Sequence, residues 1–232
     1  MKKVRVITNV IIVGILVVLS ALALPIRNTT TTTSVNPNVI YQGNTEKNSV
    51  CFMFNVYWGT EYIKDILDVL DFYEVKTTFF VGGSWAAKNI ETLKEIYTRG
   101  HEIANHGYNH KDQNKLNEKQ NQDEIMMTHK LIQANLGIEM NLFAPPSGAL
   151  DDELVDIALN LNYKTIMWSH DTIDWRDKDS NLIFKRATEN LTNGDLILMH
   201  PTQCTLQALS DILSFANNNG YRPTTVSDTI ST

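Results

Sequence analysis

The sequence of 232 residues is poor in cysteine and short of basic charge. It has only two cysteines, Cys51 and Cys204, so no framework of disulfides holds the fold together. Beyond residue 27 the chain carries 16 lysines and arginines against 26 aspartates and glutamates, a net charge of −10. A body this acidic argues against nucleic acid as the main partner, because neutralising phosphates requires a basic surface.

The overall composition also excludes several classes of protein. Apolar residues make up 43% of the chain and charged residues 20%, which is typical of a globular protein and not of collagen, a coiled coil or a fully disordered chain. The length suits one domain with a tail. Because Cys51 lies in an apolar, strand-like run, we interpret it as a buried free thiol.

The first 27 residues contain four basic residues and no acidic one, and an apolar run follows from Val6 to about Leu24. This pattern is typical of a secretory signal or of an amino-terminal membrane anchor. The 21 residues from Val6 to Ile26 are enough to cross about 30 Å of hydrocarbon. Ala21 and Ala23 would equally suit a cleavage site, so signal and anchor both stay open for residues 1–27. Either one predicts that the rest of the chain lies outside the cytoplasm.

The remainder divides into a linker and one domain. Residues 28–49 include five consecutive threonines beside serine, asparagine and proline, and they show neither helical nor strand periodicity. We therefore predict a flexible linker over 28–49 and a single folded domain over 50–232.

Short apolar runs alternate with longer helical patterns throughout residues 50–232. Strands alternating with helices indicate βαβ units and a parallel sheet, and about seven repeats favour a closed, compressed (β/α) barrel over an open sheet. The predicted strands are 50–54, 77–81, 102–104, 141–144, 165–168, 196–199 and a short one near 224–226; the predicted helices are 61–73, 84–97, 118–136, 151–161, 180–191 and 206–218.

In barrels of this kind the chemistry lies at the carboxyl ends of the strands, and histidines gather there. His106 and His110 follow one strand at a spacing that lets two imidazoles converge on one ion. Two histidines and a carboxylate are a common ligand set for catalytic zinc and related divalent metals. The pattern predicts a metal site, and a pair of ordinary surface histidines is the alternative.

His200 directly follows another apolar strand, where a general acid on the rim of a barrel would lie. A carboxylate beside it would favour the protonated imidazole, and Asp171 or Asp174 could serve. The alternative is a core histidine bonded to a backbone carbonyl. Three aromatic residues next to these polar groups suit stacking on sugar rings, although ordinary packing would also explain them: Tyr57, Trp58 and Trp175.

Four local patterns, in this order over about 180 residues, resemble the polysaccharide deacetylases of the NodB-homology type. They are residues 78–81 with 100–106 and His110, residues 145–148, residues 171–175, and residues 198–200. The sequence of residues 55–63 further resembles a subgroup of this family linked to sporulation in Gram-positive spore formers.

The resemblance implies an α/β fold, a distorted (β/α) barrel of about seven parallel strands. It also implies an enzyme that removes acetyl groups from the amino sugars of peptidoglycan or chitin-like glycans, using one divalent metal ion, zinc or else cobalt or nickel. The implied site residues are His106 and His110 as metal ligands, His200 as the acid with Asp174 and the nearby Asp171 to orient it, and Tyr57, Trp58, Pro146 and Trp175 as contacts to the cell-wall glycan.

The sequence departs from the family pattern at the positions that supply the base. The family has two adjacent aspartates, a general base and a metal ligand, where this chain has Asn55 and Val56, and an arginine where it has Ala144. An amide is not basic near pH 7, and losing a general base costs about 10²–10⁴-fold in rate. Two hypotheses follow: an atypical deacetylase, with Glu61 or His170 as a replacement base, or a glycan-binding pseudoenzyme.

Overall fold

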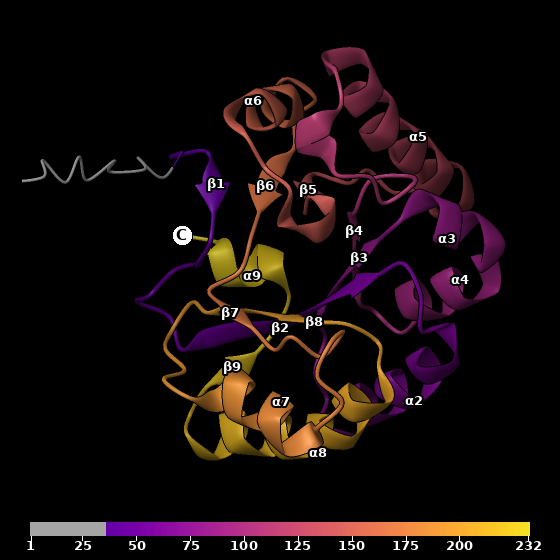
Figure 1. The fold of residues 1–232 in the computed structure, drawn as a ribbon. Helices are drawn as coiled ribbons and strands as arrows, with labels where there is room; N and C mark the ends of the chain where they lie inside the picture. The colour runs from indigo at the N-terminus through magenta and orange to yellow at the C-terminus, as the bar shows by residue number, and fades with distance from the viewer. Residues whose placement is uncertain (1–35) are drawn as a thin grey trace, which may run out of the picture. The chain divides into compact units, whose positions relative to one another are not determined.

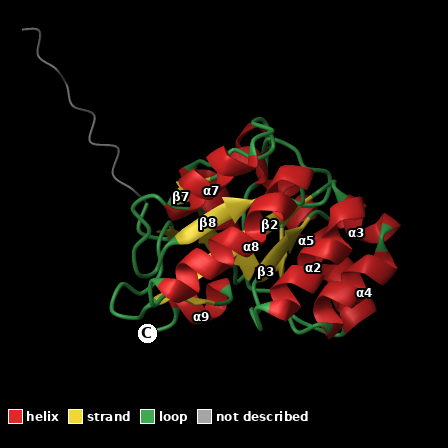
Figure 2. Ribbon diagram, turned by 90° about the horizontal axis from the view of Figure 1, so that it is seen from below, coloured by secondary structure: helices red, strands yellow, loops and turns green. Residues whose placement is uncertain are grey.

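The computed structural model describes residues 36–232, and this part of the chain is a curved sheet of parallel strands with helices around its outer side (Figure 1). Seen from below, helices flank the central strands β2, β3 and β8 (Figure 2). The sheet order is β1-β6-β5-β4-β3-β2-β8-β7, with β9 paired to β2, and each of these strand pairs is parallel. The predicted distorted (β/α) barrel of parallel strands is confirmed, but the expected closure is wrong, because the sheet of residues 36–232 is a half-barrel. The two end strands do not pair, and an isolated antiparallel bridge between Gln42 and Asp195 spans the gap.

The elements alternate along the chain as the sequence predicts. The strands are β1 (Val39–Ile40), β2 (Ser49–Val56), β3 (Thr78–Val81), β4 (Glu102–Asn105), β5 (Leu142–Phe143), β6 (Lys164–Ile166), β7 (His170–Asp171), β8 (Leu196–Met199) and β9 (Arg222–Pro223). The helices are α2 (Thr60–Phe72), α3 (Gly83–Lys88), α4 (Ile90–Thr98), α5 (Glu118–Leu136), α6 (Asp152–Asn160), α7 (Ser180–Thr188), α8 (Gln203–Asn218) and α9 (Val226–Ile230), with short 3₁₀ turns at Gln113–Lys115 and Pro146–Gly148.

Three local predictions differ from the structure. The strand β1 lies inside the stretch 28–49 that we expected to be linker, and it pairs with β6 through Val39 and Ile40. The single helix expected over 84–97 is two helices, because Asn89 leaves the helical conformation (φ −131°, ψ 44°) and its side chain donates to the carbonyl of Trp85. The strand expected near 224–226 ends at Pro223, because the Thr225 side chain caps the helix that begins at Val226.

Side chains of the strands alternate between two apolar clusters. In β2, Phe52 and Phe54 belong to the outer cluster, which packs between the sheet and the helices. Cys51 and Met53 belong to a smaller inner cluster enclosed by the curved sheet. Successive strand residues point to opposite faces of the sheet, so this alternation decides which strand-end residues face the interior.

The polar residues at the strand ends continue the inner series. Asn55 follows Cys51 and Met53 in the alternation, and His106 follows the inner Ala104. His200 follows Leu196 and Leu198, which also belong to the inner cluster. The period of two therefore brings three polar side chains from three strands to one end of the inner cluster.

The remaining predictions concern the amino-terminal segment and the two cysteines. The expected signal or anchor over 1–27 and the first part of the linker lie outside the described residues. Within residues 36–232, the helices are too short or too polar to cross a bilayer. Both cysteines are free, and Cys51 is fully buried, as the sequence predicts.

A buried ion pair at the opposite end of β8 makes stability depend on pH. The imidazole of His170 lies 3.2 Å from the carboxylate of Asp195, which is 2% exposed and also accepts from Gln42 and Thr192. The hydrogen bond to Asp195 raises the pKa of His170, and although burial opposes it, the bond from His170 and those from Thr192 and Ser169 lower the pKa of Asp195.

We expect the pair's contribution to stability to be present at pH 5.5 and to decline as the pH rises through the raised pKa of His170, because the neutral imidazole loses the charge attraction. Urea unfolding of the wild type and of His170→Gln between pH 5.5 and 8.5 measures this. The gap in unfolding free energy between the two proteins should be widest at pH 5.5. A gap that does not change with pH would contradict the prediction.

Candidate functional site

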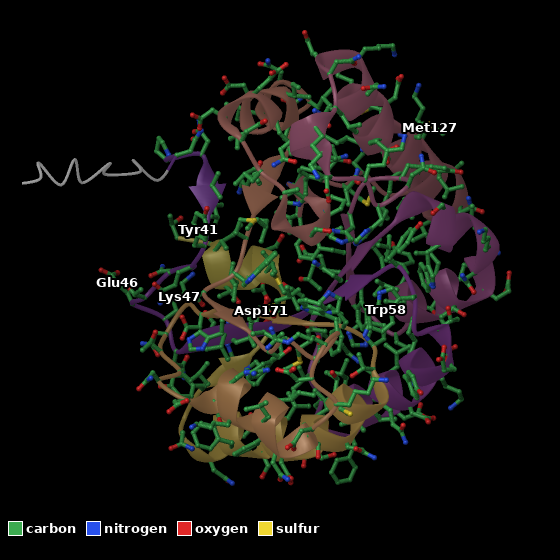
Figure 3. The ribbon with its side chains drawn as sticks, viewed as in Figure 1. Tyr41, Glu46, Lys47, Trp58, Met127 and Asp171 are labelled. Carbon is green, nitrogen blue, oxygen red and sulfur yellow. The ribbon has the colours of Figure 1, made fainter. Side chains whose placement is uncertain are left out.

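A cavity of about 360 Å³, called the main cavity below, lies at the carboxyl ends of the strands. Two residues of its wall are labelled in Figure 3: Trp58, in the segment that follows β2, and Asp171, in the end strand β7. Its lining residues are Asn55, Trp58, His106, His110, Ser147, Trp168, Asp171, Trp175, Leu198 and His200. Five of the predicted polar site residues therefore meet in one place: Asn55, His106, His110, Asp171 and His200.

The two histidines of the H-x-x-x-H pattern are adjacent in the structure. Their ring centroids are 5.2 Å apart, edge to face. His106 donates from Nδ1 to the carbonyl of Ala144 at 2.8 Å, so its Nε2 has no proton and can act as a ligand. Burial lowers the pKa of His106 to about 3, and burial also lowers the pKa of His110.

Glu124, on the buried side of α5, shapes the loop that carries both histidines. Its carboxylate accepts from the backbone N–H of Tyr108 at 2.9 Å and of Asn109 at 2.6 Å, and from the Asn109 side chain at 2.8 Å. Lys111 lies 3.2 Å from the same carboxylate. Burial alone would raise the pKa of Glu124, but these hydrogen bonds outweigh it and the pKa is lowered. No role for Glu124 was predicted from the sequence. The available signal was an acidic residue on the side of a helix that packs on the sheet.

His200 is held by Asp174, one of the two aspartates that the sequence offers as its partner. Its Nδ1 donates to Oδ1 of Asp174 at 2.7 Å, and its backbone N–H donates to Oδ2 at 2.6 Å. The hydroxyl of Thr205 also donates to Oδ2, at 2.6 Å. Asp174 is 2% exposed and its carboxylate is fully engaged, so the imidazole orientation is set and Nε2 is left for the cavity.

Asp171, the other carboxylate predicted near His200, has a different environment. Its Oδ1 accepts from the backbone N–H of Ile173 at 2.8 Å, and the side chain lines the main cavity without bonding to His200. Burial raises the pKa of Asp171. Asp174 alone orients the imidazole, because the turn through Ile173 (φ 54°) separates the two carboxylates.

The resemblance places the family's base at position 55, and there the structure has an amide in the cavity wall. Asn55 is 4% exposed, lines the main cavity, and its Oδ1 has no hydrogen-bond partner in the described residues. Val56 is fully buried and belongs to the outer cluster with Phe54. Ala144 is also fully buried, and as an alanine it lacks the guanidinium that the family's arginine would supply at that position.

The residues present do not complete a metal centre. His106 and His110 supply two imidazoles, but residues 36–232 contain no group of three or more histidine, cysteine, aspartate or glutamate side chains placed to hold an ion. Catalytic zinc normally has three protein ligands. At Val56, where the resemblance places the third ligand, an apolar side chain stands instead.

The predicted sugar contacts are placed unevenly. Trp58 (42% exposed) and Trp175 (54% exposed) line the main cavity, and Trp58 stacks on His200 with centroids 5.8 Å apart. Tyr57 instead stacks on His110 at 4.6 Å, outside the lining. Pro146 is buried, and the neighbouring Ser147 takes its place in the wall. Their roles in glycan binding stay predictions.

Three residues that line the main cavity were not predicted as site residues, and the two candidate replacement bases lie outside its lining. Ser147, Trp168 and Leu198 line the main cavity and follow, or belong to, strand-end segments that the sequence analysis did identify. Neither Glu61 nor His170, the two conceivable replacement bases, is part of that lining. His170 is tied to Asp195 before β8, because successive residues of β7 point to opposite faces and Asp171 is the one that faces the main cavity.

Comparison with protein families identifies the family to which the chain belongs. The polysaccharide deacetylase model matches residues 42–166. The chain belongs to the polysaccharide deacetylase family. Members of this family are hydrolases that act on carbon–nitrogen bonds outside peptides. A peptidoglycan-N-acetylglucosamine deacetylase of Bacillus cereus is 31% identical over 173 residues, which are 72% of this chain and 81% of that protein.

Another relative of this deacetylase-family chain is the protein YlxY of Bacillus subtilis, 38% identical over 195 residues. The match covers 84% of this chain, and the chain spans 61% of the length of YlxY. Among solved structures, a CE4 family pseudoenzyme from Bacillus anthracis is 34% identical, with a TM-score of 0.82 over 85% of this chain and 70% of that one. A mutant of that pseudoenzyme with restored enzymatic activity has the same TM-score and is 32% identical.

We expect Glu124→Gln to lower the free energy of unfolding by about 2 kcal/mol, because the carboxylate accepts with both oxygens and an amide has only one. The NH₂ group of the glutamine would face other donors, whichever way it turned. The loop that Glu124 supports carries both imidazoles, so zinc affinity should also fall, by about tenfold. Chemical unfolding and zinc titration calorimetry measure the two effects.

The control is Asp123→Asn on the same helix, which removes an exposed carboxylate paired only with Lys119. It should change the free energy of unfolding by less than about 0.5 kcal/mol and leave zinc affinity unchanged. Equal effects of the two substitutions would refute the role of Glu124.

Proposed function

We propose that this chain binds acetylated cell-wall glycan in the main cavity and that, with asparagine at position 55, it does so without appreciable deacetylation. The observation that carries the proposal is the Oδ1 of Asn55, which is buried in the cavity wall and has no protein partner in the described residues. A buried amide of this kind is suited to hydrogen-bond a ligand, and it cannot take a proton from water near pH 7.

The substitutions at the site are mutually consistent. An arginine beside the base is useful only when the base is a carboxylate, and this chain has Ala144 together with Asn55. Val56 removes the carboxylate ligand, so we expect a divalent ion, zinc first, to bind weakly through His106 and His110. The pseudoenzyme from Bacillus anthracis, similar over 85% of this chain, supports the same interpretation.

A second candidate, a slow deacetylase, is favoured by one observation. The acid half of the site is complete, because Asp174 orients His200 through both the ring and the backbone. His200 could then protonate a leaving amine, while water attack without an aspartate base would be slower by about 10²–10⁴-fold. A divalent metal ion, if bound, would supply the acidity that generates hydroxide from water.

Glycan binding and acetate release, measured on the purified full chain in a detergent without a sugar headgroup, distinguish the two candidate functions. We expect saturable binding to N-acetylglucosamine oligomers and to peptidoglycan, with no acetate released in the presence of zinc, cobalt or nickel. Binding should persist in His200→Gln, because recognition does not need the acid. Metal-dependent release of acetate that disappears in His200→Gln would establish the slow deacetylase instead.

Restoring the family residues should create or raise activity. We expect Asn55→Asp with Val56→Asp and Ala144→Arg to raise acetate release by at least about 10²-fold, because the base, its orienting arginine and the third metal ligand return together. Val56→Asp combined only with Ala144→Arg is the matched control, since it restores the ligand without the base. Equal release by the triple and the double variant would show that position 55 is not where activity was lost.

The cellular setting is part of the same proposal. We propose that the chain is exported and either anchored by residues 1–27 or released to the cell wall, and that it acts in the wall of a spore-forming bacterium. The basic and then apolar pattern of residues 1–27 supports the export. Relatives named as peptidoglycan deacetylases, in Bacillus cereus and Bacillus subtilis, support the cell-wall location.

A further inference from the structure

A line of hydrogen bonds runs from the outer side of α5 to the histidine loop, residues 106–110. Its members are Glu139, His129, Tyr163 and Asn105, together called the Tyr163 network below. The side chain of Glu139 is 68% exposed, whereas Tyr163 is 2% exposed and Asn105 is fully buried. None of the four residues lines the main cavity. The network therefore joins the surface to the histidine loop through the interior of the protein.

Asn105, at the inner end of the network, holds the histidine loop in two ways. Its side-chain oxygen accepts from the backbone N–H of Gly107 at 3.0 Å. Its backbone carbonyl accepts from the N–H of Ala144, whose own carbonyl accepts from Nδ1 of His106. The side-chain nitrogen of Asn105 donates to the carbonyl of Ile125 at 2.9 Å. A backbone N–H only donates and a carbonyl only accepts, so these two partners determine which way the Asn105 amide points.

The donor and the acceptor of each further bond follow from that orientation. The amide of Asn105 donates to the hydroxyl of Tyr163 at 3.1 Å, so the hydroxyl in turn donates to Nδ1 of His129 at 2.6 Å. A carboxylate only accepts, so Nε2 of His129 donates to Glu139 at 2.7 Å. Burial raises the pKa of Tyr163 to about 12, which keeps its hydroxyl protonated. Every bond of the network is therefore made when His129 is neutral.

A proton added to His129 conflicts with this order. Nδ1 would become a donor, and the hydrogen of the Tyr163 hydroxyl would have no other acceptor within residues 36–232. A buried donor without a partner is costly, because it has given up its bonds to water. The opposing attraction is to the exposed carboxylate of Glu139, and exposed ion pairs contribute little to stability. Protonation should therefore disturb the bonds of Tyr163, including the one from Asn105.

Other charged groups do not compensate for the added proton. Glu139 lies in the turn before β5, and it is the charged side chain within ion-pair distance of His129 in the described part of the chain. Lys130 follows His129 on α5, and Lys164 follows Tyr163 at the start of β6; both lysines are exposed.

We propose that Tyr163 and His129 are positioning residues for the histidine loop, and that protonation of His129 loosens this loop from a place outside the main cavity. The loop contributes two imidazoles to the cavity wall, so acid should weaken the binding of a ligand there. The loosening follows from the contacts of the network, whereas its effect on glycan affinity rests on the proposed function. Histidine is the side chain that ordinarily changes charge between about pH 5 and 8, so the response is expected in that range.

The test is amide hydrogen exchange of the full chain, in a detergent without a sugar headgroup, at pH 5.5 and pH 7.5. Protection is taken relative to the intrinsic exchange rate at each pH, and a peptide covering residues 105–110 reports on the N–H of Gly107. In the wild type this protection should be at least about fivefold lower at pH 5.5. His129→Gln should stay protected at both pH values, because glutamine accepts with its oxygen, donates with its nitrogen and does not titrate.

Two tyrosine variants separate positioning from general stability. Tyr163→Phe removes only the hydroxyl and should give the lower protection at both pH values. The matched control is Tyr221→Phe, which removes a tyrosine hydroxyl bonded to the carbonyl of Leu191, outside the network, and it should respond to pH like the wild type. A pH response that His129→Gln retains would overturn the proposal, even if Tyr163→Phe fails to fold. Equal losses of protection in the two tyrosine variants would also overturn it.

Calorimetric titration with N-acetylglucosamine oligomers at the same two pH values extends the test to the main cavity. From pH 7.5 to pH 5.5, affinity should fall about fivefold more in the wild type than in His129→Gln, because only the wild type can be protonated at position 129. Equal falls in the two proteins would refute the link between the network and the cavity. Absence of binding at both pH values would overturn the proposed function, and the exchange measurement would still decide whether the network positions the loop.

Discussion

The strict alternation of side chains along parallel strands is the constraint on which the site depends. Cys51 and Met53 fill the inside of the curved sheet, and the next residue in that series is Asn55. The same step leads from Ala104 to His106 and from Leu198 to His200. A shift of one residue in any of these strands would exchange the cavity residue for one that faces the helices.

The cavity that results has a histidine–aspartate pair on one side and no carboxylate base on the other. The acid half is complete, with His200 fixed by a buried carboxylate, while the base half is an amide with an unpartnered oxygen. Low local polarity would strengthen a carboxylate base at position 55 and leaves an amide without basicity. Under the proposed function, a retained acid and a lost base would separate recognition of the glycan from its hydrolysis within one site.

The loop that carries the two histidines is held from beneath by α5. Asn105 accepts from the N–H of Gly107 and donates to the hydroxyl of Tyr163 and to the carbonyl of Ile125. Glu124 then accepts from the next two backbone N–H groups. These bonds satisfy buried polar groups that would otherwise cost stability, and they fix the backbone of the loop that carries the two histidines.

The sequence by itself determined most of the order of strands and helices and the strand ends that bear polar residues, because these follow from local periodicity and residue type. Its resemblance to the polysaccharide deacetylases implied that Asn55 stands where the family has its base. Only the tertiary structure decided that Asp174 and not Asp171 holds His200, that Glu61 and His170 lie outside the main cavity, and that Glu124 supports the histidine loop. It also placed the indoles of Trp58 and Trp175 in the lining of both the main cavity and a neighbouring hollow. These facts depend on contacts between residues far apart in the chain and on the turn at Ile173, and no pattern within a short window carries that information.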